Sequence, residues 1–324
     1  MYQIKEINDL DLLKKILTKY KFNPYKHYYF NDFNPFDYKF LNFFQERNKK
    51  CFCIKKNGKI VGLTIFSKLE WDSEILKFNA GKIDFIAADG DYNNKFKIKN
   101  ILTKGIIKKC LEEGINYILC RINSNELSSI NSLISNRFIL IDGILKFSLN
   151  LKNLKLKSIN QNIETRLVDP EEIDQIKKIA RGSFKIDRFH SDPLIPNDQA
   201  DRLYEIWAEN SCKNKVADAV IVGSIDGQII SFVTCKIDKI AKEYFNLHLG
   251  VIELVATKDK FRKKRFAKYT TYGAIEWFKN NKIEIVEVGT QISNIAASRL
   301  YESCGFKLIS TSLTFRKALK RKAK

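Results

Sequence analysis

A succession of strand, helix and strand between residues 251 and 291 constrains the fold of this chain more than any other feature. Residues 251–257 read VIELVAT, an apolar run rich in β-branched side chains, and residues 269–279 carry apolar side chains at helical spacing. The run IEIVEVGTQ at 283–291 predicts a second strand. Because a connection that contains a helix normally returns the chain in the same direction, we expect the two strands to be parallel.

A second helix is predicted directly after the second strand. The segment SNIAASRLYESCGF offers Ser293 or Asn294 as its N-cap and Gly305 as its C-terminal stop. Its apolar residues recur at helical spacing. The region therefore reads as strand, helix, strand, helix, ending at Phe306.

The turn between the first strand and the first helix is strongly basic. It reads RKKRFA from Arg262 to Ala267 and brings four cations to a predicted helix N-terminus. Free backbone N–H groups and the helix dipole at such a position bind anions, which makes the turn a candidate polyphosphate site. A basic turn that is merely solvated is the alternative that the turn alone leaves open.

The turn, the second strand and the second helix share one spaced pattern. It is a basic turn of the form R-x-x-G-x-(G/A), a strand ending in TQ, and then N-x-x-A-x-x-x-Y-x-x-x-G-F. The chain follows it at Arg262, Arg265, Ala267, Gln291, Asn294, Ala297, Tyr301, Gly305 and Phe306. This pattern resembles the GNAT acetyltransferase superfamily. Arg265 stands where that family usually has glycine, so its side chain could crowd a pyrophosphate or pair with it, while its amide stays available.

Length and composition indicate two domains. The 324 residues exceed an ordinary single domain, and a hydrophobic content of 44% suffices for two cores. The first half predicts a mixed α/β unit, in which FILIDGILKFSLNL at 138–151 supplies two closing strands. Its other expected elements are strands at 3–7, 81–88 and 115–122, helices at 9–20 and 104–113, and a hairpin around Asn57-Gly58.

A polar stretch from Lys152 to Asn162 predicts the linker between the domains. We therefore expect a first domain over residues 1–152 and a second over residues 163–324.

The two halves share an internal repeat. Subtracting 168 from positions in the second half pairs residues of the same type, which indicates a duplication; coincidence among apolar strands is the alternative. The pairs are Gly273/Gly105, Ile275/Ile107, Ile283/Ile115, Phe306/Phe138, Leu308/Leu140, Ile309/Ile141, Leu313/Leu145 and Phe315/Phe147. The expected fold class is thus α/β, with two tandem GNAT-like domains, each a mixed twisted sheet flanked by helices.

At the same offset, the first half lacks the polar residues of the pattern. Arg262, Arg265 and Ala267 pair with Asn94, Lys97 and Lys99, Asn294 pairs with Glu126, and Tyr301 pairs with Leu133. We expect the first domain to be a degenerate copy with a structural or acceptor-cleft role and the second to be the catalytic acetyltransferase.

The chain is basic, with 57 Lys and Arg against 37 Asp and Glu, a formal net charge of +20. The lysines are spread along the chain, and the only dense basic segment is the tail from Arg316 to Lys324. Nucleic acid is therefore not expected as the main partner, and the surface field should instead favour anionic small molecules.

Leader and membrane-span signals, cysteines and histidines indicate the compartment and the use of metals. No basic and apolar leader opens it, and no apolar run approaches the roughly 18 residues of a membrane span, so we expect a cytoplasmic protein. Seven cysteines suggest core thiols rather than a disulfide framework. The three histidines, His27, His190 and His248, lack ligand-like neighbours, so no metal site is predicted.

A polar and aromatic loop precedes the second half's sheet. Arg188, Phe189, His190 and Asp192 stand between Ser183 and a helix that reaches Trp207. Loops of this kind usually carry binding function. With TQISN and the two-copy layout, this segment resembles the dTDP-fucosamine N-acetyltransferase type within the GNAT superfamily, which implies that these four residues and Gln291 bind the acceptor.

The resemblance also implies acetyl-CoA as co-substrate, lying between the two parallel strands. Its pantetheine would pair with the first strand and its pyrophosphate with the basic turn. The implied cofactor-binding residues are Leu254, Val255, Ala256, Arg262, Lys263, Lys264, Arg265, Phe266, Ala267, Lys268, Asn294 and Tyr301.

Tyr301 is the expected general acid for the leaving thiolate. A phenol with a reference pKa of about 10 can protonate a thiolate whose conjugate acid has a pKa near 8.5. Packing against the second strand is the alternative role for its ring. The base that takes the proton of the attacking amine stays open between Glu253, His190 and a water chain, and Glu253 could equally be paired with a lysine.

These observations predict an acetyl-CoA-dependent N-acetyltransferase. The acceptor is a small-molecule amine, by resemblance a nucleotide-linked amino sugar. Alternatives are a GNAT enzyme acting on another amine, such as a peptide N-terminus or a small metabolite, and a non-catalytic module that binds acyl-CoA or nucleic acid. A homodimer is kept as an option for the assembly.

Overall fold

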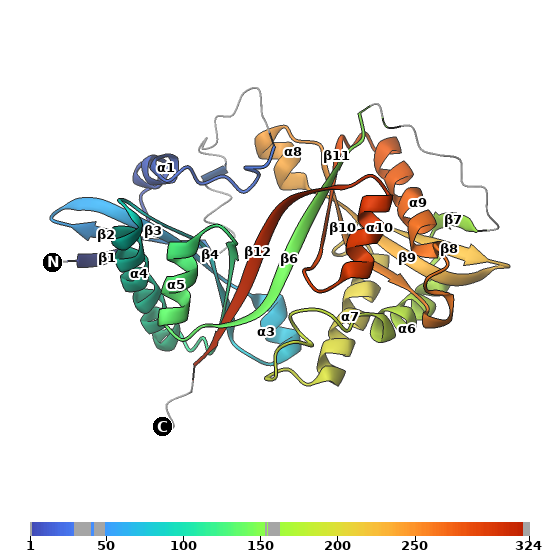
Figure 1. Cartoon of the computed structure of the whole chain (residues 1–324), viewed down its shortest axis with the longest axis horizontal. Coiled ribbons are helices and arrows are strands. Elements are labelled where there is room, and N and C mark those ends of the chain that lie inside the picture. The colour runs from blue at the N-terminus through green and yellow to red at the C-terminus, as the bar shows by residue number, and fades with distance from the viewer. Residues whose placement is uncertain (1, 29–39, 42–48, 153, 155–162, 320–324) are drawn as a thin grey trace. The chain divides into compact units, whose positions relative to one another are not determined.

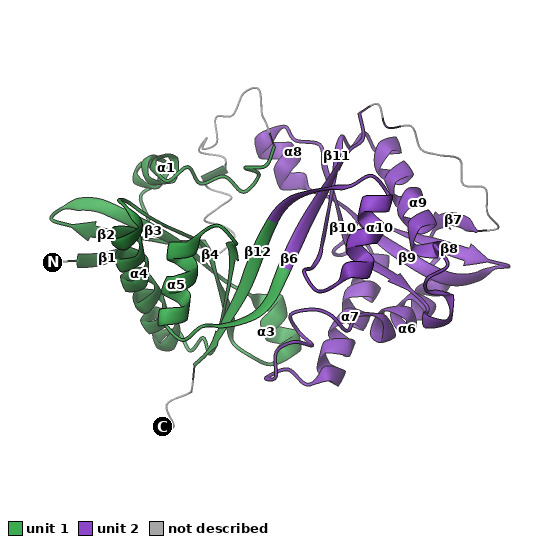
Figure 2. Ribbon diagram, viewed as in Figure 1, with its two compact units in different colours: residues 1–143, 311–324 green, residues 144–310 purple. Residues whose placement is uncertain are grey.

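Strands and helices alternate along both halves of the chain, which gives the mixed α/β fold that the sequence predicts (Figure 1). The computed structural model describes residues 2–28, 40–41, 49–152, 154 and 163–319. Within these ranges, no helix combines the length and apolar character needed to cross a membrane. The chain forms two units, residues 1–143 with 311–324 (unit 1) and residues 144–310 (unit 2) (Figure 2).

Unit 1 contains the predicted strands at its start and centre, the hairpin and both helices, of which the central one is longer, and adds two helices that were not predicted, α3 (Glu70–Leu76) and α5 (Leu127–Ser135). Its other elements before the exchanged strands are β1 (Tyr2–Glu6), α1 (Leu10–Lys19), β2 (Lys49–Lys56), β3 (Lys59–Lys68), β4 (Ala80–Ala88), α4 (Tyr92–Glu112) and β5 (Tyr117–Asn123). The predicted hairpin joins β2 to β3. It turns at Asn57 and Gly58, whose φ angles of 50° and 77° explain the Asn-Gly pair.

Unit 2 repeats this succession. Its elements are β7 (Glu164–Leu167), α6 (Ile173–Ser183), α7 (Asn197–Cys212), β8 (Ala219–Ile225), β9 (Gln228–Ile237), α8 (Lys239–Phe245), β10 (Leu249–Thr257), α9 (Phe266–Asn280), β11 (Ile285–Gln291) and α10 (Ile295–Ser303), with short 3₁₀ turns at Pro170–Glu172 and Asp259–Phe261. The equivalent hairpin joins β8 to β9 at Asp226 and Gly227, where φ is again positive.

Two long strands belong to both units. They are β6 (Ile139–Asn150) and β12 (Lys307–Ala318), and Figure 2 shows each changing colour along its length. Residues 144–150 of β6 pair with β11 in unit 2, and residues 312–318 of β12 pair with β5 in unit 1. Each unit therefore takes its last strand from the end of the other copy.

With these exchanged strands the two sheets have the same order. In unit 1 it is β1-β2-β3-β4-β5-β12, and in unit 2 it is β7-β8-β9-β10-β11-β6. Neighbours are antiparallel except β4 with β5 and β10 with β11, which are parallel. The parallel pair expected from the sequence between residues 251 and 291 is confirmed.

The exchange corrects the interpretation of residues 138–151 as two strands that close the first domain. Asp142 and Gly143, which could have turned the chain, lie inside the single strand β6. The unit boundaries accordingly differ from the expected domains 1–152 and 163–324, because unit 2 begins at residue 144 and unit 1 recovers residues 311–324. Most of the expected linker, residues 153 and 155–162, lies outside the described residues.

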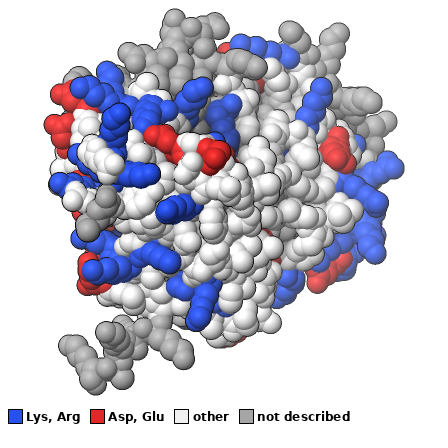
Figure 3. Space-filling model, turned by 60° about the vertical axis from the view of Figure 1, so that its left-hand side comes forward, with Lys and Arg blue, Asp and Glu red and all other residues white. Residues whose placement is uncertain are grey.

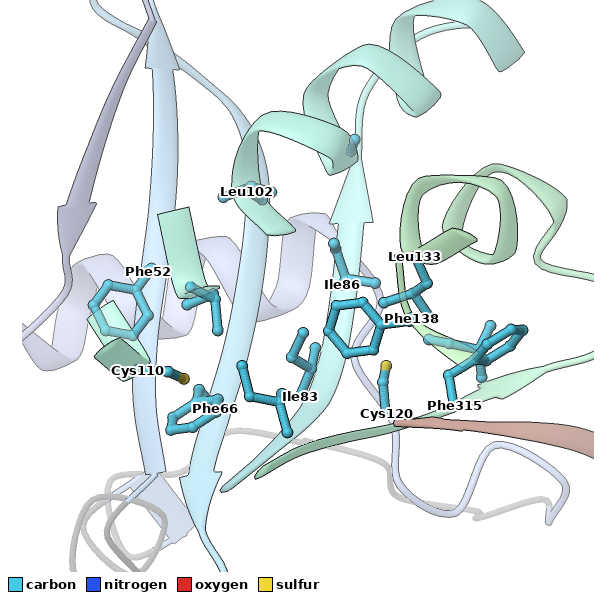
Figure 4. Packing of buried hydrophobic residues seen from close by; sticks show 14 of the residues in the cluster. Phe52, Phe66, Ile83, Ile86, Leu102, Cys110, Cys120, Leu133, Phe138 and Phe315 are labelled. Carbon is cyan, nitrogen blue, oxygen red and sulfur yellow. The ribbon is translucent and has the colours of Figure 1, made fainter. Parts of the chain in front are cut away.

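Each exchanged strand also contributes to the core of the unit it joins. Phe315 of β12 is 1% exposed and packs in the cluster that contains Leu133 and Phe138 in unit 1 (Figure 4). Phe147 of β6 is 1% exposed and packs in the unit 2 cluster with Tyr301 and Phe306. Burial of these rings ties each unit to a segment from the other end of the sequence.

Phe315→Ala is expected to destabilise unit 1, although residue 315 belongs by sequence to the second copy. Removing a buried Phe ring costs about 3–5 kcal/mol. Hydrogen exchange followed by mass spectrometry should show faster exchange in β5 than in the wild type, with β11 little changed.

Phe147→Ala is the matched control and should give the reverse result, with faster exchange in β11 and little change in β5. Faster hydrogen exchange in β11 alone in the Phe315→Ala variant would contradict the strand exchange.

Candidate functional site

The parallel strands of unit 2 pair only over part of their length. The ladder joins Leu249–Ile252 to Ile285–Val288 and then ends. Strand β10 continues to Thr257 paired with β9, and β11 continues to Gln291 paired with β6. Beyond Ile252 and Val288, the described residues of β10 and β11 form no further ladder with each other, so the two facing strand edges diverge.

A bulge in β10 marks the point of divergence. The register between β9 and β10 shifts between Ile252 and Val255, and the Leu254 N–H donates to the Thr234 hydroxyl at 2.9 Å instead of to a ladder carbonyl. Bulges bend a strand and increase its twist, which carries β10 away from β11. The expected pantetheine-binding residues 254–256 lie in this diverging segment.

The basic turn after β10 adopts a strained backbone. Lys263 and Arg265 have φ angles of 62° and 66°, in the left-handed region that favours glycine. Arg265 immediately precedes α9, and its carbonyl accepts the first hydrogen bonds of that helix, from the N–H groups of Lys268 and Tyr269. The position where the resembling family has glycine thus keeps the backbone shape that glycine would adopt.

The amide groups of this turn are available to a ligand. Among the described residues, none accepts a hydrogen bond from the N–H groups of residues 263–267. Successive free N–H groups at left-handed turns form concave anion sites, and the N-terminus of α9 adds its dipole. The side chains of Lys263, Lys264 and Arg265 are exposed around them.

Arg262 braces this turn to its surroundings. Its guanidinium donates to Asp259 at 2.9 Å and to the carbonyls of Thr257 and Ser183 at 3.3 Å each. These bonds tie the turn to the end of β10 and to the end of α6. Contact of Arg262 with a cofactor stays a prediction, but its structural contribution to the turn is clear.

The end of β11 and the start of α10 each carry a residue of the sequence pattern. The Asn294 side chain caps the helix by accepting a hydrogen bond from the Ala297 N–H at 3.1 Å. Gln291, at the end of β11, is half-buried. The N-cap expected at Ser293 or Asn294 is therefore Asn294.

The Tyr301 ring is part of the unit 2 core. It is 4% exposed and lies 5.9 Å from the Phe147 ring and 6.0 Å from the Phe306 ring. Burial raises the pKa of its phenol, with a smaller contribution from Cys304. The phenol thus keeps its proton at neutral pH, which an acid requires, although the raised pKa makes the proton harder to release.

Glu253 lies in the bulge of β10 with its side chain 20% exposed. Its Oε1 atom is 3.4 Å from the Lys236 ammonium, so the lysine pairing considered from the sequence is present. Burial raises the pKa of this carboxyl, while Lys236 and a hydrogen bond from the Trp207 indole lower it. Its Oε2 atom is buried and has no hydrogen-bond partner among the described residues.

The polar loop before α7 is largely folded inward. Phe189 is 3% exposed and Asp192 is fully buried, with Asp192 accepting from the Leu194 N–H at 3.1 Å. The His190 ring lies between Asp187, at 2.6 Å, and Asp201, at 3.1 Å. Arg188 lies over the Phe189 ring at 4.1 Å. Contact of these residues with an acceptor stays a prediction.

Sequence reasoning missed two residues at this site, Lys236 and Trp207. Both act on Glu253 from other elements, the neighbouring strand β9 and the helix α7. Lys236 sits on the strand that neighbours β10, so pairing the two predicted strands could have suggested it. No spacing rule in the sequence points to Trp207.

The first copy keeps the diverging strands but closes the space beside its helices. The ladder between β4 and β5 also ends early, after Ile83 and Cys120. Helix α4, however, starts at Tyr92, and because 92 + 168 = 260, its first turns occupy the positions that form the basic turn in unit 2. The Asp91 carboxylate already accepts from the Asn94 N–H at 2.9 Å. An anion at this N-terminus would meet that carboxylate.

A buried lysine joins the two helices of the first copy. The Lys99 side chain is 3% exposed, and its ammonium donates to Glu126 at 3.2 Å and to the hydroxyls of Ser128 and Ser129 at 3.0 and 2.7 Å. The equivalent residue on α9 is Ala267, which cannot reach α10. Between the described residues of α9 and α10, the one side-chain hydrogen bond is a 3.4 Å contact from Tyr272 to the Ser303 carbonyl.

Positive charge is spread over the face shown in Figure 3, where Lys and Arg alternate with uncharged and acidic side chains. The described part of the basic tail lies in β12, where Arg316 is 7% exposed and Lys317 donates to the Asn136 carbonyl at 2.8 Å. These two cations are therefore engaged within unit 1, while residues 320–324 lie outside the described chain.

Comparison with known proteins agrees with this geometry. Residues 174–306 match the model of the acetyltransferase (GNAT) family. Over 254 residues the chain is 23% identical to the spore coat polysaccharide biosynthesis protein SpsD of Bacillus subtilis (strain 168), covering 78% of this chain and 82% of SpsD.

Two solved structures share the fold. A GCN5-related N-acetyltransferase from Sphaerobacter thermophilus has a TM-score of 0.63 at 10% identity, covering 98% of this chain and 95% of that one. A tandem GNAT protein from the clavulanic acid biosynthesis pathway has a TM-score of 0.59 at 7% identity, covering 98% of each chain. The two-copy architecture expected from the internal repeat is thus confirmed.

Arg265→Gly should stabilise unit 2 by about 0.5–1 kcal/mol. A left-handed backbone costs a non-glycine residue roughly 1–2 kcal/mol, and the greater freedom of glycine in the unfolded chain returns part of that gain. Urea unfolding provides the measurement.

Arg265→Ala is the matched control, because it removes the charge and keeps the strain, and its stability should equal that of the wild type. A Gly variant no more stable than the Ala variant would show that the turn is not strained at this position.

Proposed function

We propose that this chain is an enzyme that transfers the acetyl group of acetyl-CoA to the amine of an amino sugar, preferably one linked to a nucleotide, because residues 174–306 match the model of the acetyltransferase (GNAT) family. The observation that carries the proposal is the divergence of β10 and β11 beside the left-handed turn that opens α9. The left-handed turn with free N–H groups lies in unit 2, which supports the second copy as the catalytic one.

The donor groups of unit 2 fit acetyl-CoA. The edge of β10 after its bulge offers backbone groups to the amides of pantetheine, as an added strand would. The free N–H groups of residues 263–267 and the exposed cations beside them suit a pyrophosphate. Acetyl-CoA supplies an activated thioester, and the protein supplies its orientation and the proton transfers.

Two side chains can manage the protons. The Glu253 carboxylate has a buried oxygen with no described partner, and its raised pKa brings it closer to the range useful for a base near neutrality. The Tyr301 phenol stays protonated and can give its proton to the leaving thiolate sulfur. The neutral amine nitrogen forms a bond to the acetyl carbon, the carbon–sulfur bond breaks, and the departing sulfur takes the Tyr301 proton.

The acceptor class is supported by the relative in polysaccharide biosynthesis. An amine on a sugar, protonated in solution, must lose a proton before attack, which gives the Glu253 carboxylate its role. The basic turn and the overall charge of +20 favour anionic molecules such as nucleotide sugars.

Coenzyme A should raise the melting temperature and bind one molecule per chain. A ligand selective for the folded state at a hundred times its Kd stabilises by about 2.7 kcal/mol. Arg262→Glu should abolish most of the shift, since it removes the brace of the turn and reverses its charge.

Lys97→Glu, at the position in the first copy that corresponds to Arg265, is the control and should leave the shift intact. Absence of any shift with the wild type at saturating coenzyme A would refute the acetyl-CoA proposal.

Tyr301→Phe should lower kcat about 10²–10⁴-fold, the usual contribution of a positioned proton donor, while stability and coenzyme A affinity change little. Thiol release should be followed against a panel of amines that includes nucleotide-linked amino sugars, hexosamines and peptides. An unchanged kcat would assign Tyr301 to packing alone. A preference for peptide amines would replace the amino sugar as the proposed acceptor.

A further inference from the structure

We infer that Trp207 and Lys236 are positioning residues that hold the Glu253 carboxylate in place for taking the proton of the acceptor amine. This inference rests on the proposed function, since it assigns a support to the base of that reaction. It concerns residues that no family pattern in the sequence singles out.

The bulge gives Glu253 an unusual place on its strand. Residues 253 and 254 of β10 face the single residue Thr234 of β9, whose hydroxyl accepts from the Leu254 N–H. A bulge re-aims side chains relative to a regular ladder and so requires other contacts to fix their direction. For Glu253 the measured contact is with Lys236 of β9, 3.4 Å from Oε1. The Trp207 indole on α7 also acts on this carboxyl and lowers its pKa.

Trp207 is itself held by a column of aromatic rings. The Tyr204 ring stacks on Phe184 at 4.3 Å and on Trp207 at 6.0 Å, with interplanar angles of 15° and 12°. The His190 ring is near-parallel to Tyr204 on the loop side, at 6.2 Å. Offset stacking fixes the plane of each ring, so the direction of the indole N–H is set by the loop before α7.

Ionic contacts secure the same helix. The His190 Nε2 atom lies 3.1 Å from Asp201 of α7, and Lys185 lies 2.6 Å from the same carboxylate. Asp201 and Tyr204 are three residues apart and therefore share a helix face. The inward-folded loop thus acts on the site through α7, which gives its burial a functional reason.

Charged groups around Glu253 pull its pKa in opposite directions. Burial raises the pKa, and the Asp218 carboxylate before β8 raises it further. The Lys236 ammonium and the Trp207 hydrogen bond lower it. A base must be ionised at the working pH, so the two positioning residues offset the penalty of burial.

The test compares the pH dependence of kcat/KM in four variants. A net hydrogen bond contributes about 0.5–1.5 kcal/mol, so its loss moves a titration by roughly 0.5–1 pH unit. Trp207→Phe and Lys236→Met should each move the acid limb to higher pH by that amount, with the KM for acetyl-CoA unchanged. Asp218→Asn should move the limb to lower pH, and Trp277→Phe, on α9, should leave it in place.

A second measurement needs no acceptor. Titration of the carboxyl carbons of ¹³C-labelled glutamate by NMR, with Glu253 assigned by Glu253→Gln, should show the same signs in the same variants. Acid limbs and NMR titrations identical to the wild type in both Trp207→Phe and Lys236→Met would overturn the inference. Changes of the expected signs in the Glu253 titration, without acetyl transfer to any amine, would support the positioning of Glu253 by these residues and refute the proposed function.

Discussion

The hydrogen bonding of β11 to β6 is the interaction on which the site depends. Residues 144–150 pair with β11 over its whole length, including the part from Gly289 to Gln291 that has left β10. Strand β10 is likewise paired with β9 up to Thr257. Each diverging strand therefore keeps one satisfied edge, and only the edges that face the divergence need a partner. A strand separation that would otherwise leave backbone groups unpaired on both sides becomes tolerable.

The two copies show that this divergence alone does not make a site. Both parallel ladders end after the same number of pairs, yet the helix that follows differs. In unit 2 it starts late, after a strained turn with free N–H groups, and its first turn carries the small residue Ala267. In unit 1 it starts early, capped by Asp91, and Lys99 ties it to α5. A buried lysine bound to two hydroxyls stabilises the closed arrangement that a ligand would have to open.

Three residues of the sequence pattern have a clear part in the fold. Arg262 braces the turn, Asn294 caps α10, and the Tyr301 ring fills the core beside Phe147. Glu253 differs, because its carboxylate is buried with one oxygen that no described group satisfies. An incompletely satisfied carboxylate costs stability, and such a cost is most readily retained where the group has a function.

The sequence by itself determined the succession of strand, helix, strand and helix between residues 251 and 306, the parallel pair within it, the hairpin at Asn57-Gly58 and the duplication, because local periodicity and turn chemistry are written in neighbouring residues. It also located the basic turn and restricted the cap of α10 to Ser293 or Asn294. It did not determine which strand closes which sheet, because β6 and β12 are apolar strands that could pair equally well with either copy. Nor did it find Lys236 and Trp207, which reach Glu253 from a neighbouring strand and a distant helix. Those outcomes depend on contacts between segments far apart in the chain, and only the tertiary structure decides them.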